Sequence, residues 1–270
     1  MFRFAPPRLV NYGLRSCLAL SITYLLTANV QAGILTFDQA PNGSTPTDNS
    51  GLGINDAYHI NGVEVTFGFD TIADGTWTAD TPAIFEQVGD SDSGNGFQSY
   101  YAGGGHDVAR PGASSSLGDF FLRQPNAIGA FPEALVIDYD QNISALSGEI
   151  WDIDTGSFPS YEQWLVSAYT ASGALVDSTL SPQGLRQTDI NSLDGLPWTF
   201  SLSGNGIRKV TIEFVGTTSI VGLAFDNFNP TAASAVPEPT SFAILGLGAL
   251  SLVALRRRRM GVSSGTPQAS

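Results

Sequence analysis

The sequence predicts an all-β protein whose body is an antiparallel β-sandwich with a jelly-roll-like strand pattern. Apolar and polar residues alternate with a period of two in many short segments between residues 33 and 230. Clusters of Gly, Asn and Ser separate these segments, and no window of the body has the apolar period of an amphipathic helix. Many short strands without crossover helices favour antiparallel sheets that pack face to face.

The first 32 residues are typical of a secretory signal peptide. Three arginines accompany an apolar run over residues 17–26, and small residues ending at Ala32 allow cleavage between Ala32 and Gly33. An N-terminal membrane anchor is the alternative, but a spanning helix needs roughly 20 apolar residues. We therefore expect the secretory translocon to export the chain and the mature protein to begin at Gly33.

Period-two patterning predicts the clearest strands of the body at residues 63–67, 134–139, 163–169 and 209–214. Turns are predicted at Asn61-Gly62, 171–173 and 203–206, because Gly, Asn and Ser favour tight turns. Three tryptophans lie in strand-like segments and are expected in the core: Trp151, Trp164 and Trp198.

Residues 89–118 interrupt the strand pattern with a segment rich in glycine and serine. A loop of this length inside a compact domain is usually functional or disordered. It contains Tyr100, Tyr101 and His106, which together with Trp77 could bind sugars by stacking and hydrogen bonding. The alternative is that these aromatic side chains fasten the loop to the edge of the sandwich.

The body is strongly acidic, with five basic and 24 acidic residues between positions 33 and 236, a formal net charge of −19. Nucleic acid is therefore not an expected partner, because proteins that bind it need a basic face. Carboxylates are ligands for hard cations such as Ca²⁺. The sequence does not otherwise require a cofactor.

Asp38 and Asp226 are candidate ligands of a structural Ca²⁺. Asp38 ends the first predicted strand, residues 34–38, and Asp226 lies in the last, residues 222–228. First and last strands of a sandwich often run side by side. The pattern resembles that of jelly-roll carbohydrate-binding modules, which frequently hold calcium between carboxylates near both termini. Alternation predicts Leu223 and Phe225 on the inner face of the last strand, with Asp226 and Phe228 on the other.

Asp152 and Asp154 form a second acidic pair, two residues apart at a predicted strand end. Both side chains would lie on one face, and a cation would relieve their repulsion. The alternative is a solvated strand end.

A non-catalytic body is expected from the absence of familiar catalytic motifs. The sequence has no Gly-x-Ser-x-Gly, no His-Glu-x-x-His and no phosphate-binding or dinucleotide-binding glycine loop. Its one cysteine, Cys17, lies in the predicted signal peptide. A glycoside hydrolase or lyase that uses paired carboxylates is the enzymatic alternative.

The chain ends with a proline-framed glutamate, an apolar segment and an arginine block. Pro237, Glu238 and Pro239 follow a linker of small residues at 231–236 and precede an apolar segment at about 240–255. A single transmembrane helix there would be marginally long for a hydrocarbon core of about 30 Å. The arginine block would keep its end, and the tail at 260–270, in the cytoplasm. The arginines are Arg256, Arg257, Arg258 and Arg259.

This three-part ending resembles the PEP-CTERM sorting signal of certain Gram-negative bacteria, at residues 237–259. The resemblance implies recognition of Pro237, Glu238 and Pro239 by exosortase, a membrane-embedded transpeptidase-like enzyme that removes the tail. Proteins with this signal are exported, typically in organisms that make exopolysaccharide. We therefore expect transient anchoring in the inner membrane with the body in the periplasm, then a place at the cell surface or in a matrix of exopolysaccharide or biofilm. A plain membrane anchor is the alternative.

Overall fold

The computed structural model describes residues 33–72, 74–89, 96–125, 133–155, 159–218 and 222–233. The predicted signal peptide, transmembrane helix and sorting signal lie outside these residues. Within the described part of the chain no helix could cross a membrane, and the regular structure is entirely β. The strands are β1 Gly51–Leu52, β2 Tyr58–Ile60, β3 Val63–Asp70, β4 Ala83–Gln87, β5 Gln98–Ser99, β6 Gly105–His106, β7 Phe120–Arg123, β8 Ala134–Trp151, β9 Asp154–Thr155, β10 Trp164–Thr170, β11 Leu175–Leu180, β12 Leu185–Arg186, β13 Pro197–Phe214 and β14 Ala224–Ala232.

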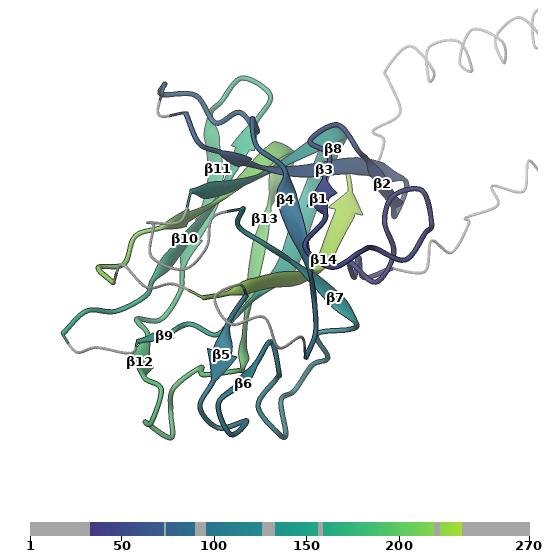
Figure 1. Cartoon of the computed structure of the whole chain (residues 1–270). Coiled ribbons are helices and arrows are strands. Elements are labelled where there is room, and N and C mark those ends of the chain that lie inside the picture. Colours follow the sequence, from purple (N-terminus) through teal and green to yellow (C-terminus); the bar gives the residue numbers. More distant parts are fainter. Residues whose placement is uncertain are drawn as a thin grey trace, which may run out of the picture. The chain divides into compact units, whose positions relative to one another are not determined.

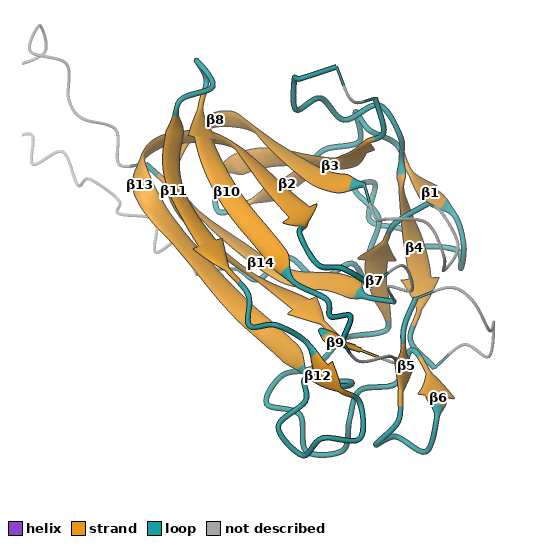
Figure 2. Cartoon of the chain, turned by 90° about the vertical axis from the view of Figure 1, so that its left-hand side faces the viewer, coloured by secondary structure: helices purple, strands orange, loops and turns teal. Residues whose placement is uncertain are grey.

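Ten of these strands form one antiparallel sheet, which confirms the predicted all-β class (Figure 1). We divide this sheet into two halves, and the long strands β8 and β13 run through both of them. The first part of β8 pairs with β3 and the last part of β13, beside β10 and β11. The second part of β8 pairs with β14, which leads on through β7 and β4 to β1 (Figure 2). The two halves bury a common core, and the jelly-roll likeness remains a prediction.

The predicted turn at residues 203–206 is wrong, because these residues lie inside β13. The pairing of β13 with β8 shifts register between Ser203 and Ile207 and again between Ile207 and Lys209. Gly206 has a φ of 81°, which residues with a side chain rarely adopt. The glycine-rich segment therefore forms a bulge where β13 passes from one half of the sheet to the other.

Asn61 and Gly62 do form the predicted turn, between β2 and β3. Their φ values of 53° and 77° are both positive, as a two-residue type I′ hairpin requires.

Aromatic side chains from both halves of the sheet fill the main core. Phe37 packs edge-on against Phe67 at a ring-centroid distance of 5.3 Å, and Phe228 lies 6.0 Å from Phe37. Trp164 is fully buried in this core and Trp198 is partly buried against it. Trp151 is buried in a second cluster. The predicted core tryptophans are thus confirmed.

The prediction that Phe228 shares the face of Asp226 is wrong. Phe228 lies in the main core with Leu223 and Phe225, because the register between β14 and β8 shifts between Asp226 and Asn229. Asn227 takes a φ of 57° at this bulge. The extra residue turns Phe228 inward. The strand continues to Ala232, four residues beyond its predicted end at Phe228.

Residues 34–38 do not form the predicted strand; only Leu35 pairs, in an isolated bridge to Phe228. The first segment of the body thus does lie beside the last strand.

The described part of the long glycine- and serine-rich segment, residues 96–118, is packed against the sheet. Phe97 and Leu117 from this segment are buried against Phe121, Trp151 and Ala224 on the outer face. The segment also contains the hairpin of β5 and β6. These strands lie with β9 and β12 at one end of the body, at the bottom of Figures 1 and 2.

Candidate metal centre

Three buried aspartates converge at the end of the body that carries β9 and β12. Asp152 follows the last residue of β8, Asp154 lies in β9, and Asp194 lies in the loop between β12 and β13. One carboxylate oxygen of each residue lies within 4.8 Å of those of the other two. Their exposed fractions are 4%, 7% and 0%. The alternative of a solvated strand end at Asp152 and Asp154 is therefore wrong.

A fourth carboxylate, Glu162, lies beside the three aspartates, close enough for the charges of Asp154 and Asp152 to raise its pKa, and we call these four residues the acidic centre. Glu162 lies between β9 and β10 and is 2% exposed. Its backbone N–H donates to the Asp154 carbonyl oxygen at 3.3 Å. Its side-chain oxygen Oε2 is buried and has no hydrogen-bond partner among the described residues.

Burial and mutual repulsion disfavour the charged forms of Asp152, Asp154 and Glu162. The pKa of Asp154 is raised to about 7, mainly by burial and also by the charge of Asp194. Burial, followed by the charge of Asp154, raises the pKa values of Asp152 and Glu162 well above their usual range. Without a cation these carboxylates cannot all be ionised at neutral pH at low cost.

The backbone around the acidic centre holds its side chains in place. Asp152 has a φ of 69°, an uncommon conformation for a residue with a side chain. Its Oδ1 accepts a hydrogen bond of 2.7 Å from the backbone N–H of Gly195. Asp194 accepts the backbone N–H groups of Tyr100 and Tyr101 at 2.8 and 3.0 Å, and the hydroxyl of Ser99 at 3.1 Å.

The structure places Tyr100, Tyr101 and His106 near one another, on or beside the hairpin of β5 and β6. Tyr101 fastens this segment, since its hydroxyl donates to the Thr188 carbonyl at 3.0 Å and the Arg110 guanidinium lies 3.9 Å from its ring centroid. Tyr100 is 52% exposed and packs edge-on against Tyr101. Of the two tyrosines, Tyr100 thus offers the more accessible face.

Trp77 lies elsewhere, in the loop after β3 at the opposite end of the body (Figures 1 and 2). It lines a hollow of about 600 Å³ with Tyr169, Arg208 and Lys209, and Lys209 Nζ donates to its carbonyl oxygen. The structure therefore does not combine Trp77 with the tyrosines in one surface.

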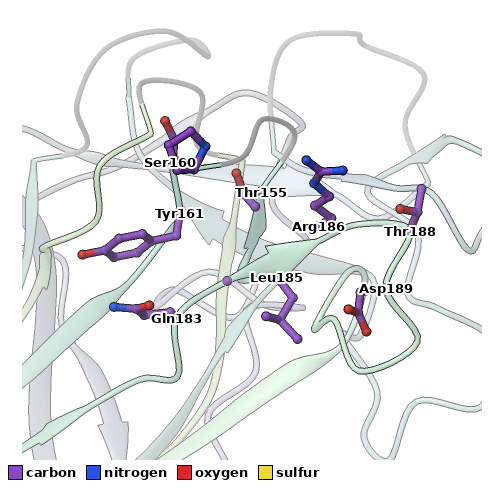
Figure 3. Close-up of a pocket in the computed structure, with 10 residues that line it drawn as sticks. Thr155, Ser160, Tyr161, Gln183, Leu185, Arg186, Thr188 and Asp189 are labelled. Carbon is purple, nitrogen blue, oxygen red and sulfur yellow. The ribbon is translucent and has the colours of Figure 1, made fainter.

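A second hollow of about 600 Å³ adjoins the acidic centre (Figure 3). Thr155 and Tyr161 line it. Thr155 directly follows Asp154 in the chain, and Tyr161 directly precedes Glu162. Figure 3 shows Tyr161 and Gln183 on one side and Arg186, Thr188 and Asp189 on the other. Local patterns in the sequence predict neither this hollow nor the roles of Asp194 and Glu162, because residues as far apart as Thr155 and Asp189 come together only in the fold.

Asp38 and Asp226 lie close enough for the charge of Asp38 to raise the pKa of Asp226. Burial is the larger cause and brings this pKa to about 9; Glu149, opposite Asp226 on β8, raises it further. Asp38 accepts hydrogen bonds from the backbone N–H groups of Asp119 and Phe120. The predicted proximity is thus present, and calcium binding by this pair stays a prediction.

The family model of the PEP-CTERM protein-sorting motif matches residues 235–259. This chain carries a PEP-CTERM sorting motif. The motif includes Pro237, Glu238, Pro239 and the four arginines, all outside the described residues. A PEP-CTERM motif indicates an exported protein that exosortase processes, with a cell-surface or extracellular destination in Gram-negative bacteria.

No curated protein matches the chain. Among solved structures, the enzymatically active domain of tailspike protein 4 from bacteriophage CBA120 is similar with a TM-score of 0.22 and 12% identity. The match covers 68% of this chain and 19% of the tailspike chain, and a likeness of this degree carries no argument about fold or activity.

Proposed function

We propose that this protein is a non-catalytic component of the cell surface or extracellular matrix, associated with exopolysaccharide or biofilm. The observation that carries the proposal is the PEP-CTERM motif at residues 235–259. The route begins with a signal peptide cleaved after Ala32 and passes through a transient membrane anchor. It ends with removal of the C-terminal tail near Pro237–Pro239.

The burial of the acidic centre supports a non-catalytic role. A glycosidase needs its two carboxylates beside the bond that it cleaves. Asp152, Asp154 and Asp194 are at most 7% exposed. A polysaccharide has no direct access to them, which favours a structural role for these acids.

Carbohydrate binding is a second candidate, favoured by the hollow beside the acidic centre. Tyr161 offers an aromatic ring, and Gln183, Arg186 and Asp189 offer hydrogen-bonding groups around it. This combination suits sugars, which stack on rings and hydrogen-bond through their hydroxyls. The exposed Tyr100 is the alternative stacking residue. It lies in the loop for which the sequence predicts sugar binding by aromatic side chains.

Intact mass of the protein from membrane and extracellular fractions of the native host tests the main proposal. We expect a product that begins at Gly33 and ends near Pro237–Pro239. Replacing these three motif residues by alanine should leave unprocessed protein in the membrane, whereas Asp189→Ala in the body should not. Normal release of the motif variant would contradict exosortase processing.

Binding to an array of polysaccharides tests the second candidate. Loss on Tyr161→Ala with retention on Tyr100→Ala would identify the hollow, and the reverse pattern would identify the loop. Turnover of any polysaccharide by the wild type would contradict the non-catalytic proposal and favour a hydrolase or lyase.

A further inference from the structure

We propose that Asp152, Asp154, Asp194 and Glu162 bind one Ca²⁺ ion, at a site distinct from the predicted pair Asp38 and Asp226.

The spacing of the carboxylates fits a single ion. Calcium holds its oxygen ligands at about 2.3–2.6 Å, so oxygens on opposite sides of the ion lie roughly 5 Å apart. The three aspartates each offer one oxygen within 4.8 Å of the others. A common ion among them therefore requires little movement of these side chains.

Glu162 provides an independent indication of a ligand. Its side chain is 98% buried, and Oε2 has no hydrogen-bond partner among the described residues. The backbone N–H of Glu162 donates to the Asp154 carbonyl oxygen at 3.3 Å, and the charges of Asp154 and Asp152 act on its side chain, which places Glu162 against the aspartates. A buried, unpaired carboxylate oxygen is costly, and a bound cation would supply its missing partner.

The donor chemistry selects calcium. The group consists of carboxylates alone, which are hard oxygen ligands, whereas zinc sites in proteins usually include His or Cys. Magnesium keeps several of its waters and seldom occupies a cage of protein carboxylates. An exported protein also meets calcium concentrations that fill sites with dissociation constants of about 10⁻⁴–10⁻³ M.

The ion would join segments that lie far apart in the chain. Asp152 and Asp154 bring in the end of β8 and β9, Glu162 the segment before β10, and Asp194 the loop before β13. Through Asp194 it would also support the turn at Tyr100 and Tyr101. Thr155 and Tyr161 of the adjoining hollow flank two ligands, so calcium would fix the walls of that hollow as well.

Calcium titration of the purified full-length protein in detergent, after removal of metal with EDTA, tests the site directly. We expect calorimetry with CaCl₂ to show binding. At about 100 times the dissociation constant the melting temperature should rise by roughly 5–10 °C. MgCl₂ at the same concentration should have a much smaller effect.

Asp154→Asn and Glu162→Gln identify the ligands, because each removes a charge with little change of shape. Each should weaken calcium binding by roughly tenfold or more. In EDTA, neither variant should melt below the wild type, since each removes a carboxylate whose charged form burial and repulsion disfavour; this separates ligand loss from misfolding. Asp189→Asn, at an exposed position outside the acidic centre, is the matched control and should keep the calcium response. Absence of calcium binding by the wild type, or binding unchanged in both ligand variants, would overturn the proposal.

Discussion

Asp194 accepts the backbone N–H of Tyr101 in a hydrogen bond of 3.0 Å that joins residues 93 positions apart in the chain. The same carboxylate accepts the N–H of Tyr100 and the hydroxyl of Ser99. It is fully buried and also belongs to the acidic centre. One side chain thus connects the candidate metal centre to the loop that carries the exposed Tyr100.

Asp194→Ala is expected to release this loop as well as to weaken the acidic centre. Three hydrogen-bond donors would lose their acceptor, and each buried donor left unpaired costs about 1–3 kcal/mol. We expect a loss of unfolding free energy of several kcal/mol in urea and faster cleavage between residues 99 and 112 by a protease. Asp189→Ala, an exposed aspartate of the same loop, should change neither measurement. Equal cleavage of the two variants would show that Asp194 does not hold the loop.

Much of the sheet could be predicted from local patterning, because inward and outward residues alternate along each strand. The strands predicted at 134–139 and 209–214 are the beginning of β8 and the end of β13. The remaining parts of β8 and β13 were not predicted as strands, because glycine and polar residues within them resemble turns. At Ser203–Gly206 the same residues that make a turn also allow a bulge, and only pairing with β8 decides between the two.

The acidic centre could be predicted only in part. The spacing of Asp152 and Asp154 is visible in the sequence, but their burial depends on Glu162, Asp194 and the loop at 96–118, which the fold brings together. Asp38 and Asp226 were predicted as neighbours from their places in the first and last segments. No local pattern revealed that Asp226 would be fully buried.

Gly148→Ala is expected to destabilise the main core. A Cβ atom at this position on β8 would lie 2.7 Å from Phe228 and 2.8 Å from Phe200, both in the packed aromatic core. Overpacking of this kind typically costs about 1–3 kcal/mol. Urea unfolding should show this loss, whereas Ser147→Ala, its neighbour in the strand, should stay within about 0.5 kcal/mol of the wild type. Unchanged stability of Gly148→Ala would mean that the two rings can move apart freely.

Arg123 and Glu86 form a buried ion pair between β7 and β4. Arg123→Leu should cost about 3–5 kcal/mol, because it leaves the Glu86 carboxylate in the interior without the guanidinium. The double variant Arg123→Leu/Glu86→Leu should recover most of that loss, since it removes both charges. Urea unfolding of the two single variants and the double variant measures the coupling. If the double variant lost as much unfolding free energy as the two single variants together, a strong interaction between Arg123 and Glu86 would be contradicted.

The stability of the calcium-free protein is expected to fall as the pH rises, with Asp226 as one cause. Its pKa is about 9 in the folded protein, mainly because of burial, with Asp38 and Glu149 adding repulsion and the backbone N–H groups of Asn227 and Phe37 offsetting part of it. In the unfolded chain an aspartate has a pKa of about 3.9. The folded state therefore holds the proton more tightly. The stabilisation is complete below about pH 4 and is lost as the pH rises through about 9.

Asp226→Asn isolates this contribution, because asparagine keeps the shape of the side chain and stays neutral at every pH. Urea unfolding in EDTA at pH 5, 7 and 9 should show the variant gaining stability relative to the wild type at each step, by at most about 1.4 kcal/mol per pH unit. Asp189→Asn, at an exposed site, should follow the wild-type profile. Parallel profiles for Asp226→Asn and the wild type would mean that Asp226 is already ionised at neutral pH, and the predicted calcium pair with Asp38 would then gain support.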